Sequence, residues 1–490
     1  MRKKLSIILL TMTATLSATA QALQGDSIGN DTLSVTTQMS QTDHLLKYPV
    51  QALGEVTILN GIIHGLNRYV LNEAYAQTTL KSIRRNFHKG YIWDNDNYYT
   101  NEMGHPYQGN LYFNAARSNG LNFWQSVPYA LTGSLIWEYL GETEQPSIND
   151  IVTTTIAGSF MGEVTHRLAR YFIDERERGA SRFAREAAAA LFNPVEGFHR
   201  LVSGRMWKVQ SNTPSTHSAN DDFFRLSVGD RYIANADNMC NGQHQTFLNF
   251  AMECGETPDD EPHFAPYDYF AIDGTFAIGK GQHMVSDLSM TGRICSTPLH
   301  TGQNTKSELG LYQYFYYNDI HLPDDSRGAF PFGEAISFGP ALTLAFPRLV
   351  PHMTFRQHLY AKGIGLGTAE SDYYDVHERQ YNMGSGYGVS SQSRLTWENM
   401  NSMQFDAYYM HLYTWKGYEP HNMKEPGLSV LGDRSNARLL RLSMQLRTRL
   451  YQQWSLALGA SFFCRHTHYK YHSTHRTDSY ELRAGLEWQL

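Results

Sequence analysis

The last eleven residues of the chain alternate strictly between apolar and polar side chains. One face carries Tyr480, Leu482, Ala484, Leu486, Trp488 and Leu490, and the other carries Glu481, Arg483, Glu487 and Gln489. Successive side chains of a strand point to opposite faces, so this segment is predicted to be a strand with one apolar and one polar face. Such a strand is typical of a membrane barrel with a polar lumen, although the last strand of a soluble sandwich can alternate in the same way.

The same alternation recurs back to about residue 222. Between residues 440 and 450, apolar side chains alternate with a polar face that carries Arg441, Arg447 and Arg449, and three arginines on one face require a wet or paired interior. Further strands are predicted near 222–235, 244–255, 270–278, 284–296, 307–318, 332–346, 352–363, 384–398, 404–409 and 454–464. Polar, turn-rich segments separate them, and the total of roughly 12 strands is an even number that suits an antiparallel barrel.

The preceding part of the chain has a helical period instead. Apolar residues recur at helical spacing between Gly54 and Gln77, and further helices are predicted over 121–140, with an interruption at Pro128, over 147–178 and over 182–192. Ser147 followed by Asp150 is a capping-box start. Segment 193–209, which carries apolar residues among basic ones, is predicted to be ordered and to lie at an interface. The expected fold class is therefore α+β, with an N-terminal helical domain over 47–210 followed by a transmembrane antiparallel β-barrel over 215–490.

The first residues have the features of an export signal. Residues 2–4 are basic, residues 5–16 form an apolar stretch too short to span a bilayer as a helix, and Ala20-Gln21-Ala22 is a small-x-small cleavage site. We expect a signal peptide over 1–22 and a disordered leader over 23–46, which is rich in Ser, Thr, Gln and Asp. No later run of about 18 apolar residues predicts a helical span. These features predict the cell outer membrane as the location, with the helical domain on the periplasmic side.

Composition agrees with this location. Aromatic residues make up 13% of the chain, including 31 tyrosines, while the mean hydropathy is −0.45, as expected when half of every spanning strand faces water. The net charge of −6 gives no indication of nucleic-acid binding. Four scattered cysteines do not form a disulfide framework or a metal motif. Cys240 and Cys254 either pair across a hairpin or remain free thiols.

Five sequence blocks, in order, carry a resemblance to a known family. They are HPYQGNLYFNAARSNG at 105–120, SLIWEY at 134–139, PSIND at 146–150, GEV at 162–164 and NPVEGFHRL at 193–201. With them, residues 90 to 210 resemble domain-of-unknown-function family 3943. The resemblance implies an exported Gram-negative protein in which a helical block precedes a predicted barrel, and it implies no established reaction. The order of His105, Glu138, Ser147, Asp150 and Gly162 is also similar to that of VanZ-like membrane proteins, although residues 152–155 lack the expected Asn.

The candidate catalytic residues are His105, Glu138, Asp150, Glu163 and His166. A neutral histidine near carboxylates is a general-base arrangement, and the same groups can hold a divalent metal. Glu163 and His166 are three residues apart on a helix and share a face. Each group also has a structural interpretation. Asp150 caps its helix, Glu138 pairs with an arginine such as Arg117, His105 hydrogen-bonds the chain near a helix start, and Glu163 with His166 lies on a solvated helix face.

No nucleophile motif, HExxH motif or phosphate loop accompanies these groups, which disfavours a conventional hydrolase, zinc protease or nucleotide enzyme. We expect no cofactor and no bound metal. The histidine-rich stretch 466–475 is predicted to be a polar loop or an adventitious metal binder. In the barrel, seven charged residues either fill the lumen with salt bridges or select a substrate: Asp406, Arg441, Arg447, Arg449, Glu481, Arg483 and Glu487.

Two classes of function remain open. In the first, the barrel acts in envelope maintenance or in binding or passage of a small envelope-derived molecule, and the helices gate its mouth. In the second, the protein is a membrane-surface enzyme that processes a lipid or glycan through His105, Glu138 and Asp150. The expected partners are outer-membrane lipid and a lipid or glycan ligand, with no nucleic acid and no obligate protein partner. A secreted sandwich without a barrel is disfavoured by aromatic residues near strand ends, such as Tyr387 and Trp397.

Overall fold

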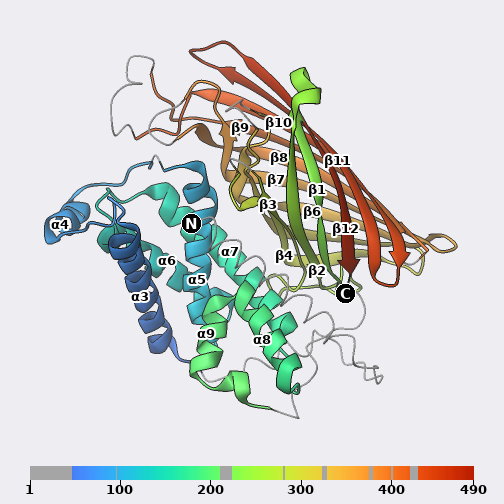
Figure 1. Ribbon diagram of the computed structural model, residues 1–490, viewed down its shortest axis with the longest axis horizontal. Coiled ribbons are helices and arrows are strands. Elements are labelled where there is room, and N and C mark those ends of the chain that lie inside the picture. The colour runs from blue at the N-terminus through green and yellow to red at the C-terminus, as the bar shows by residue number, and fades with distance from the viewer. Residues whose placement is uncertain are drawn as a thin grey trace. The chain divides into compact units, whose positions relative to one another are not determined.

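The computed structural model describes residues 47–94, 96–209, 223–279, 282–322, 328–374, 379–398, 401–419 and 429–489. The chain forms two compact units (Figure 1). The helical unit comprises the chain up to Tyr91 together with His105–Asn220, and the barrel unit comprises Ile92–Gly104 together with Asp221–Leu490. The expected signal peptide, the leader up to residue 46 and Leu490 lie outside the described residues.

The helical unit contains seven α-helices and three short helical turns among its described residues. They are α3 (Pro49–Gly65), η2 (Leu66–Leu71), α4 (Leu80–His88), α5 (His105–Ser118), α6 (Phe123–Ile136), η4 (Trp137–Gly141), α7 (Ile148–Phe172), α8 (Gly179–Phe192), α9 (Pro194–Val202) and η5 (Arg205–Trp207). The predicted interruption at Pro128 is wrong, because α6 continues through it. A proline removes one backbone donor, and a helix can tolerate that single loss. Helix α9 and η5 show that segment 193–209 is ordered.

Helices α5 and α7 meet at two glycines, Gly109 from the first sequence block and Gly158. A Cβ atom on Gly109 would lie 1.8 Å from the Thr154 carbonyl oxygen, and one on Gly158 would lie 2.6 Å from the Gly109 Cα. Only glycine permits this backbone approach. The last block joins the same core, since Asn193 caps α9 and donates a 2.7 Å hydrogen bond to Asn114 Oδ1. The first and last sequence blocks are therefore in contact in one helical core.

The barrel unit is a closed antiparallel barrel with the strand order β1-β12-β11-β10-β9-β8-β7-β6-β5-β4-β3-β2. The strands are β1 (Phe223–Asn235), β2 (Gln243–Cys254), β3 (Phe270–Ile278), β4 (Val285–Thr301), β5 (Lys306–Asn318), β6 (Phe332–Val350), β7 (Met353–Glu370), β8 (Tyr381–Trp397), β9 (Asn401–Tyr413), β10 (Ser435–Tyr451), β11 (Trp454–Tyr469) and β12 (His475–Gln489). The predicted α+β class and strand number are confirmed. Closure pairs every strand with two neighbours and leaves no open edge.

The two faces of the terminal strand follow the predicted alternation. Leu482 and Leu486 are 54% and 47% exposed, whereas Glu481 and Glu487 on the alternate face are buried. Leu486 lies in register with Val228 on β1 and Leu456 on β11, so apolar side chains adjoin across strands on the outer surface. An apolar outside and a charged inside are the features of an outer-membrane barrel. No helix in the described part of the chain is long and apolar enough to cross a membrane.

The connections between strands differ at the two ends of the barrel. At the end where β1 begins and β12 ends, the connections 302–305, 351–352 and 452–453 are short and 255–269 is long. At the opposite end, 279–284 and 470–474 are short, and the connections 319–331, 371–380 and 414–434 are long. We call the end that carries connections 319–331, 371–380 and 414–434 the long-connection end.

Segment Ile92–Gly104, which was expected within the helical domain, packs in the barrel unit at the long-connection end. The Tyr98 hydroxyl donates to the Asn318 carbonyl oxygen at 3.0 Å, and its ring stacks on Tyr317 with 5.5 Å between centroids. Asn101 Nδ2 donates to the Tyr381 hydroxyl at 2.5 Å. These contacts join the segment to the end of β5 and the start of β8. The periplasmic position of the helical unit stays a prediction.

Candidate functional site

Three predicted catalytic residues of the helical unit are linked through the start of α7. His105 Nε2 lies 3.3 Å from Asp150 Oδ1, and the Glu138 carboxylate accepts a 2.8 Å hydrogen bond from the backbone N–H of Ser147. The Ser147 hydroxyl accepts from the Asp150 N–H, so Ser147 caps the helix as predicted. Asp150 does not act as the cap, because its carboxylate contacts His105 and accepts a 2.8 Å hydrogen bond from Asn149.

Glu163 and His166 form a second group, and the prediction of a solvated helix face is wrong. Glu163 is fully buried and is held by Arg117 at 2.9 Å and Arg167 at 2.8 Å. The predicted partner of Arg117 was Glu138, and the structure places Glu163 there instead. Burial, together with the positive charges of Arg117, Arg170 and Arg167, holds the pKa of His166 well below its usual range. His166 is therefore neutral at pH 7.

These helical clusters have the chemistry of a buried polar core. His105, Glu138 and Asp150 are 4%, 2% and 1% exposed. A catalytic group must reach its substrate, and each of these side chains faces protein partners in the described structure. The catalytic role of these residues stays a prediction. The observed contacts fit a structural role equally well.

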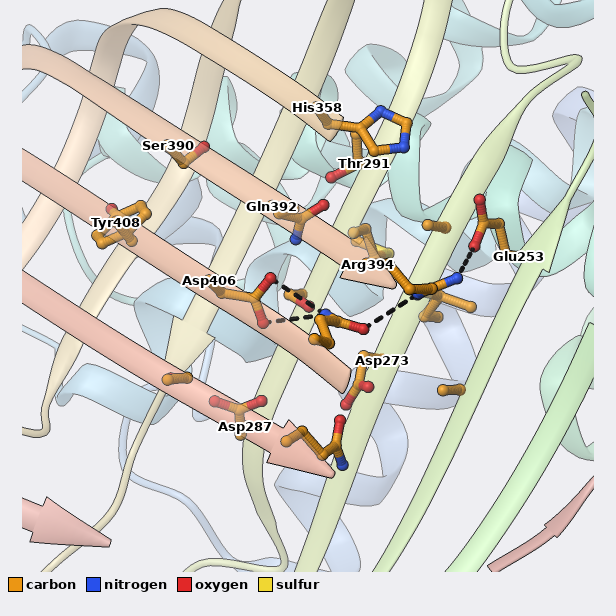
Figure 2. A pocket seen from close by; sticks show the side chains of 18 of the residues that line it. Glu253, Asp273, Asp287, Thr291, His358, Ser390, Gln392, Arg394, Asp406 and Tyr408 are labelled. Carbon is orange, nitrogen blue, oxygen red and sulfur yellow. Dashed lines mark hydrogen bonds and ion pairs between the residues drawn. The ribbon is translucent and has the colours of Figure 1, made fainter. Parts of the chain in front are cut away.

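The barrel lumen holds a cavity of about 240 Å³ with charged walls (Figure 2). The walls consist of the residues at every second strand position, which face inward. On β8 these residues are Ser390, Gln392 and Arg394. The charged lining consists of Arg225, Arg356, Lys362, Arg394, Arg441, Arg447 and Arg483 against Glu253, Asp273, Asp287 and Asp406. Three of these cations pair with carboxylates that lie just outside the lining: Lys362 with Glu334, Arg447 with Glu487 and Arg483 with Glu481. The positive charge is therefore in local excess where Arg356 and Arg394 share the one carboxylate of Glu253.

One ion-pair cluster spans the lumen from wall to wall. Glu253 on β2 accepts a 2.9 Å hydrogen bond from Arg394 on β8 (Figure 2). It also accepts a 2.8 Å hydrogen bond from Arg356 on β7. In the closed strand order, β2 and β8 are six positions apart in either direction, so they are opposite walls. Both guanidinium groups thus meet one carboxylate across the lumen and narrow it at this level.

Further hydrogen bonds extend this network along the lumen. Arg394 donates to the Gln404 side-chain oxygen at 3.2 Å, and Gln404 in turn donates to Asp406 at 2.9 Å (Figure 2). Arg441 on β10 donates to the Tyr316 hydroxyl on β5, which is a second bond between nearly opposite walls. The lumen is thus lined by polar groups that are largely paired with one another.

Most of the charged residues expected in the lumen lie there. The structure pairs Arg447 with Glu487 at 3.1 Å and Arg483 with Glu481 at 2.7 Å, and Asp406 and Arg441 line the cavity. Arg449 differs, because it is exposed near the end of β10. The alternation correctly gave its face, but a strand that extends beyond the lumen carries its last polar residues into solvent.

Sequence reasoning missed Glu253, Arg356 and Arg394. The alternation along 352–363, with Arg356, His358 and Lys362 on one face, was a signal for a basic lumen wall. Their meeting with Glu253 depends on closure of the barrel, which brings strands about 100 residues apart into contact. A pattern within one strand contains no information on the opposite wall.

Segment Ile92–Gly104 also places an acidic side chain in the barrel unit. Glu102 is fully buried close to Gly333 and Thr368. Burial raises the pKa of Glu102 to about 8, although a hydrogen bond from Thr368 and the charge of Arg379 act in the opposite direction. The carboxyl group is therefore mainly protonated at pH 7.

The remaining sequence features have structural roles. The four cysteines are thiols, and no disulfide bond joins Cys240 to Cys254. The histidine-rich stretch 466–475 is only partly a loop, because its first residues extend β11 and His475 begins β12.

A family model described as "Domain of unknown function (DUF3943)" matches residues 90–195. These residues form a DUF3943 domain. The match confirms the resemblance drawn from the sequence blocks, and it gives no support to the VanZ-like resemblance. The matched range includes segment Ile92–Gly104, so the DUF3943 domain contributes to both compact units. No curated protein matches the chain.

Several solved barrel structures are similar to the chain at low identity. The NanC porin is 10% identical with a TM-score of 0.28, and the match covers 54% of this chain and 100% of that one. The KdgM porin in complex with disordered oligogalacturonate is 9% identical with a TM-score of 0.22, covering 54% and 98% of the two chains. The Pseudomonas putida toluene transporter TodX is 8% identical with a TM-score of 0.21, covering 56% and 90%. These likenesses carry no information on what this chain binds.

Proposed function

We propose that the barrel binds a small anionic, envelope-derived molecule in its lumen and allows its passage across the outer membrane. The observation that carries the proposal is the Glu253–Arg356–Arg394 cluster, in which two guanidinium groups share one carboxylate across the lumen. A local excess of fixed positive charge at such a constriction raises the local concentration of anions. The helical unit is assigned no catalytic step in this function.

The cluster offers a physical mechanism for selection. Glu253 already occupies the anion position between Arg356 and Arg394, at 2.8 and 2.9 Å. A carboxylate or phosphate of the guest competes with Glu253 for the same guanidinium donors, since both are recognised by forked N–H groups. Exchange of the internal carboxylate for the guest anion leaves both arginines paired at each stage. A cation or a neutral guest cannot replace the Glu253 carboxylate as the partner of the two arginines.

The first prediction tests anion selection in planar lipid bilayers. The full mature protein is expected to pass small anions in preference to cations, as measured by the reversal potential under a potassium chloride gradient. Replacing both Arg356 and Arg394 by glutamine removes two unit charges at the constriction. We expect the anion-to-cation permeability ratio to fall by roughly thirtyfold, because each of the two charges contributes about 1 kcal/mol at close range in water.

Two further variants make this experiment decisive. Glu253→Gln is expected to raise anion conductance, because it frees the two arginines from their internal counter-ion. Arg449→Gln removes the same kind of charge from the exposed end of β10, so selectivity should match the wild-type protein. Cation preference in the wild-type protein, or equal changes in the Arg449 and Arg356/Arg394 variants, would contradict the proposal.

A second candidate function rests on the 3.3 Å contact between His105 and Asp150, which is the geometry of an oriented general base. In that case the helical unit processes a lipid or glycan. Because both side chains are almost fully buried, we favour the structural role. A catalytic role and a structural role predict different effects of substitution. Loss of a catalytic group leaves the protein folded, whereas loss of a structural group lowers its stability.

The second prediction separates these roles with His105→Ala and Glu138→Gln in a deletion strain. We expect both variants to lower the amount of heat-modifiable protein, because removing a buried partner costs about 1–3 kcal/mol. The exposed His88 provides the control, and His88→Ala should leave the protein level unchanged. Normal protein levels together with a changed envelope lipid or glycan profile, read by mass spectrometry, would establish the catalytic role instead.

A further inference from the structure

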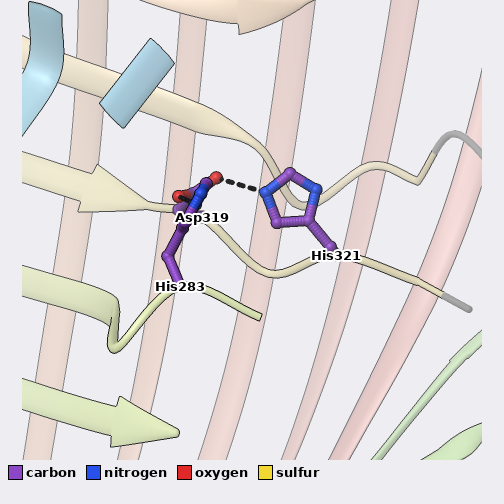
Figure 3. A group of neighbouring side chains, drawn as sticks. All are labelled: His283, Asp319 and His321. Atoms are coloured by element: carbon purple, nitrogen blue, oxygen red, sulfur yellow. Dashed lines mark hydrogen bonds and ion pairs between the residues drawn. The ribbon is translucent and has the colours of Figure 1, made fainter. Parts of the chain in front are cut away.

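Two loops at the long-connection end of the barrel bring two histidines to one carboxylate (Figure 3). His283 lies before β4, whereas Asp319 and His321 follow β5. His283 Nδ1 is 2.5 Å from Asp319 Oδ2, and His321 Nε2 is 2.7 Å from Asp319 Oδ1. Each carboxylate oxygen therefore faces a different imidazole, and the three side chains converge on one point.

The spacing of these donors suits a metal ion. One ligand atom from each residue lies within 4.8 Å of the other two. Bond lengths of about 2.0–2.2 Å place neighbouring ligands of a tetrahedral zinc ion about 3.4 Å apart, so small rotations of exposed imidazoles are sufficient. Two imidazoles and one carboxylate are donors preferred by zinc and related divalent ions, whereas calcium and magnesium prefer oxygen ligands.

The surroundings hold the donors in place as in known metal sites. Asp319 is 1% exposed, its Oδ2 accepts a 2.6 Å hydrogen bond from the Tyr317 hydroxyl, and its N–H donates to the Ser286 carbonyl at 2.8 Å. The His321 N–H donates to the Gln282 side-chain oxygen at 3.1 Å, which ties the two loops together. Outer partners of this kind orient metal ligands and tune their affinity. The two imidazoles are 51% and 42% exposed, so an ion can enter from solvent.

We propose that His283, Asp319 and His321 form a three-ligand site for a divalent transition metal, best matched by zinc, that clamps two loops of the barrel. Three protein ligands leave a further coordination position for water or an exogenous donor. The site is adjacent to segment Ile92–Gly104, since the Tyr99 ring lies 5.3 Å from His283 and Tyr98 stacks on Tyr317. Bound metal thus stabilises the loops that hold this segment. This proposal is independent of anion passage.

The third prediction tests the site with zinc as the probe. The full mature protein is purified in detergent without a histidine tag, equilibrated with Zn²⁺ and analysed for bound metal by mass spectrometry and calorimetry. We expect His283→Ala and His321→Ala each to bind one zinc ion fewer per chain than the wild type, or to bind it at least about tenfold more weakly. Tyr317→Phe keeps the ring and loses the hydroxyl, so about tenfold weaker binding is expected.

The matched control is another exposed histidine–aspartate pair. His244 Nδ1 lies 2.7 Å from Asp230 Oδ2, and no second histidine of the described residues completes a metal cluster there. His244→Ala should bind as much zinc as the wild type, and zinc should raise the unfolding temperature of both, but not of the His283 and His321 variants. Heat-modifiability confirms that each variant is folded. Equal zinc binding by the wild type and both variants, or none by the wild type, would overturn the proposal.

Discussion

Replacing Leu458 by arginine is expected to destabilise the folded barrel by about 2–4 kcal/mol, the cost of a cation near the bilayer midplane. Leu458 is 42% exposed on the outer face of β11 and lies in register with Leu446 and Ala484, so lipid surrounds it on the barrel surface. The measurement is the free energy of unfolding in guanidinium chloride with phospholipid vesicles, read by tryptophan fluorescence.

The same strand provides the control. Ser461 is an odd number of residues away, lines the lumen cavity and lies in register with Glu481. Ser461→Arg should cost much less, because the introduced cation meets water and polar groups on the inner face instead of lipid. Equal destabilisation at both positions would show that the assigned faces are wrong.

Replacing Gly109 by valine is expected to unfold the helical unit while the barrel stays folded. The new side chain would collide with the Thr154 carbonyl oxygen, which is backbone and cannot rotate away. Overpacking of a core usually costs about 1–3 kcal/mol, and a backbone collision belongs at or above the upper end of that range. Limited proteolysis of the full protein in membranes should then degrade residues 105–209 rapidly and spare a heat-modifiable barrel fragment.

Gly54 offers a matched control in another helix. A Cβ atom there has no neighbour within 4 Å, and the residue is exposed on α3. Gly54→Ala should leave proteolysis unchanged or slow it, because alanine favours a helix by about 0.5–1 kcal/mol. Rapid cleavage in the Gly54 variant, or protection in the Gly109 variant, would contradict the proposed helix contact.

The barrel could be predicted from local pattern because lipid imposes a strict rule on every spanning strand. Side chains such as Leu482 and Leu486 must face lipid, and their neighbours Glu481 and Glu487 must face the lumen. The sequence of each strand therefore indicates which of its faces is turned to lipid and which to the lumen. The number of strands, roughly twelve, followed from such segments separated by turns, without knowledge of their partners.

The candidate site was much less accessible to this reasoning. Asp150 illustrates the reason, because its spacing from Ser147 predicted a cap, whereas the tertiary contact is with His105. Glu163 showed the same limit, since a helix face that looks solvated by sequence is buried against Arg117 from another helix. Local spacing determines which groups share a face, but the partner of a buried charge comes from a different element.

The sequence by itself determined the two-part organisation, the strand faces and the DUF3943 blocks, because these depend on periodicity within short segments. Only the tertiary structure decided that Glu253 meets Arg356 and Arg394 across the lumen and that Asp319 lies between His283 and His321. It also decided that Ile92–Gly104 packs with the barrel. The physical reason is barrel closure, which creates contacts between residues far apart in the chain whose geometry no local pattern records.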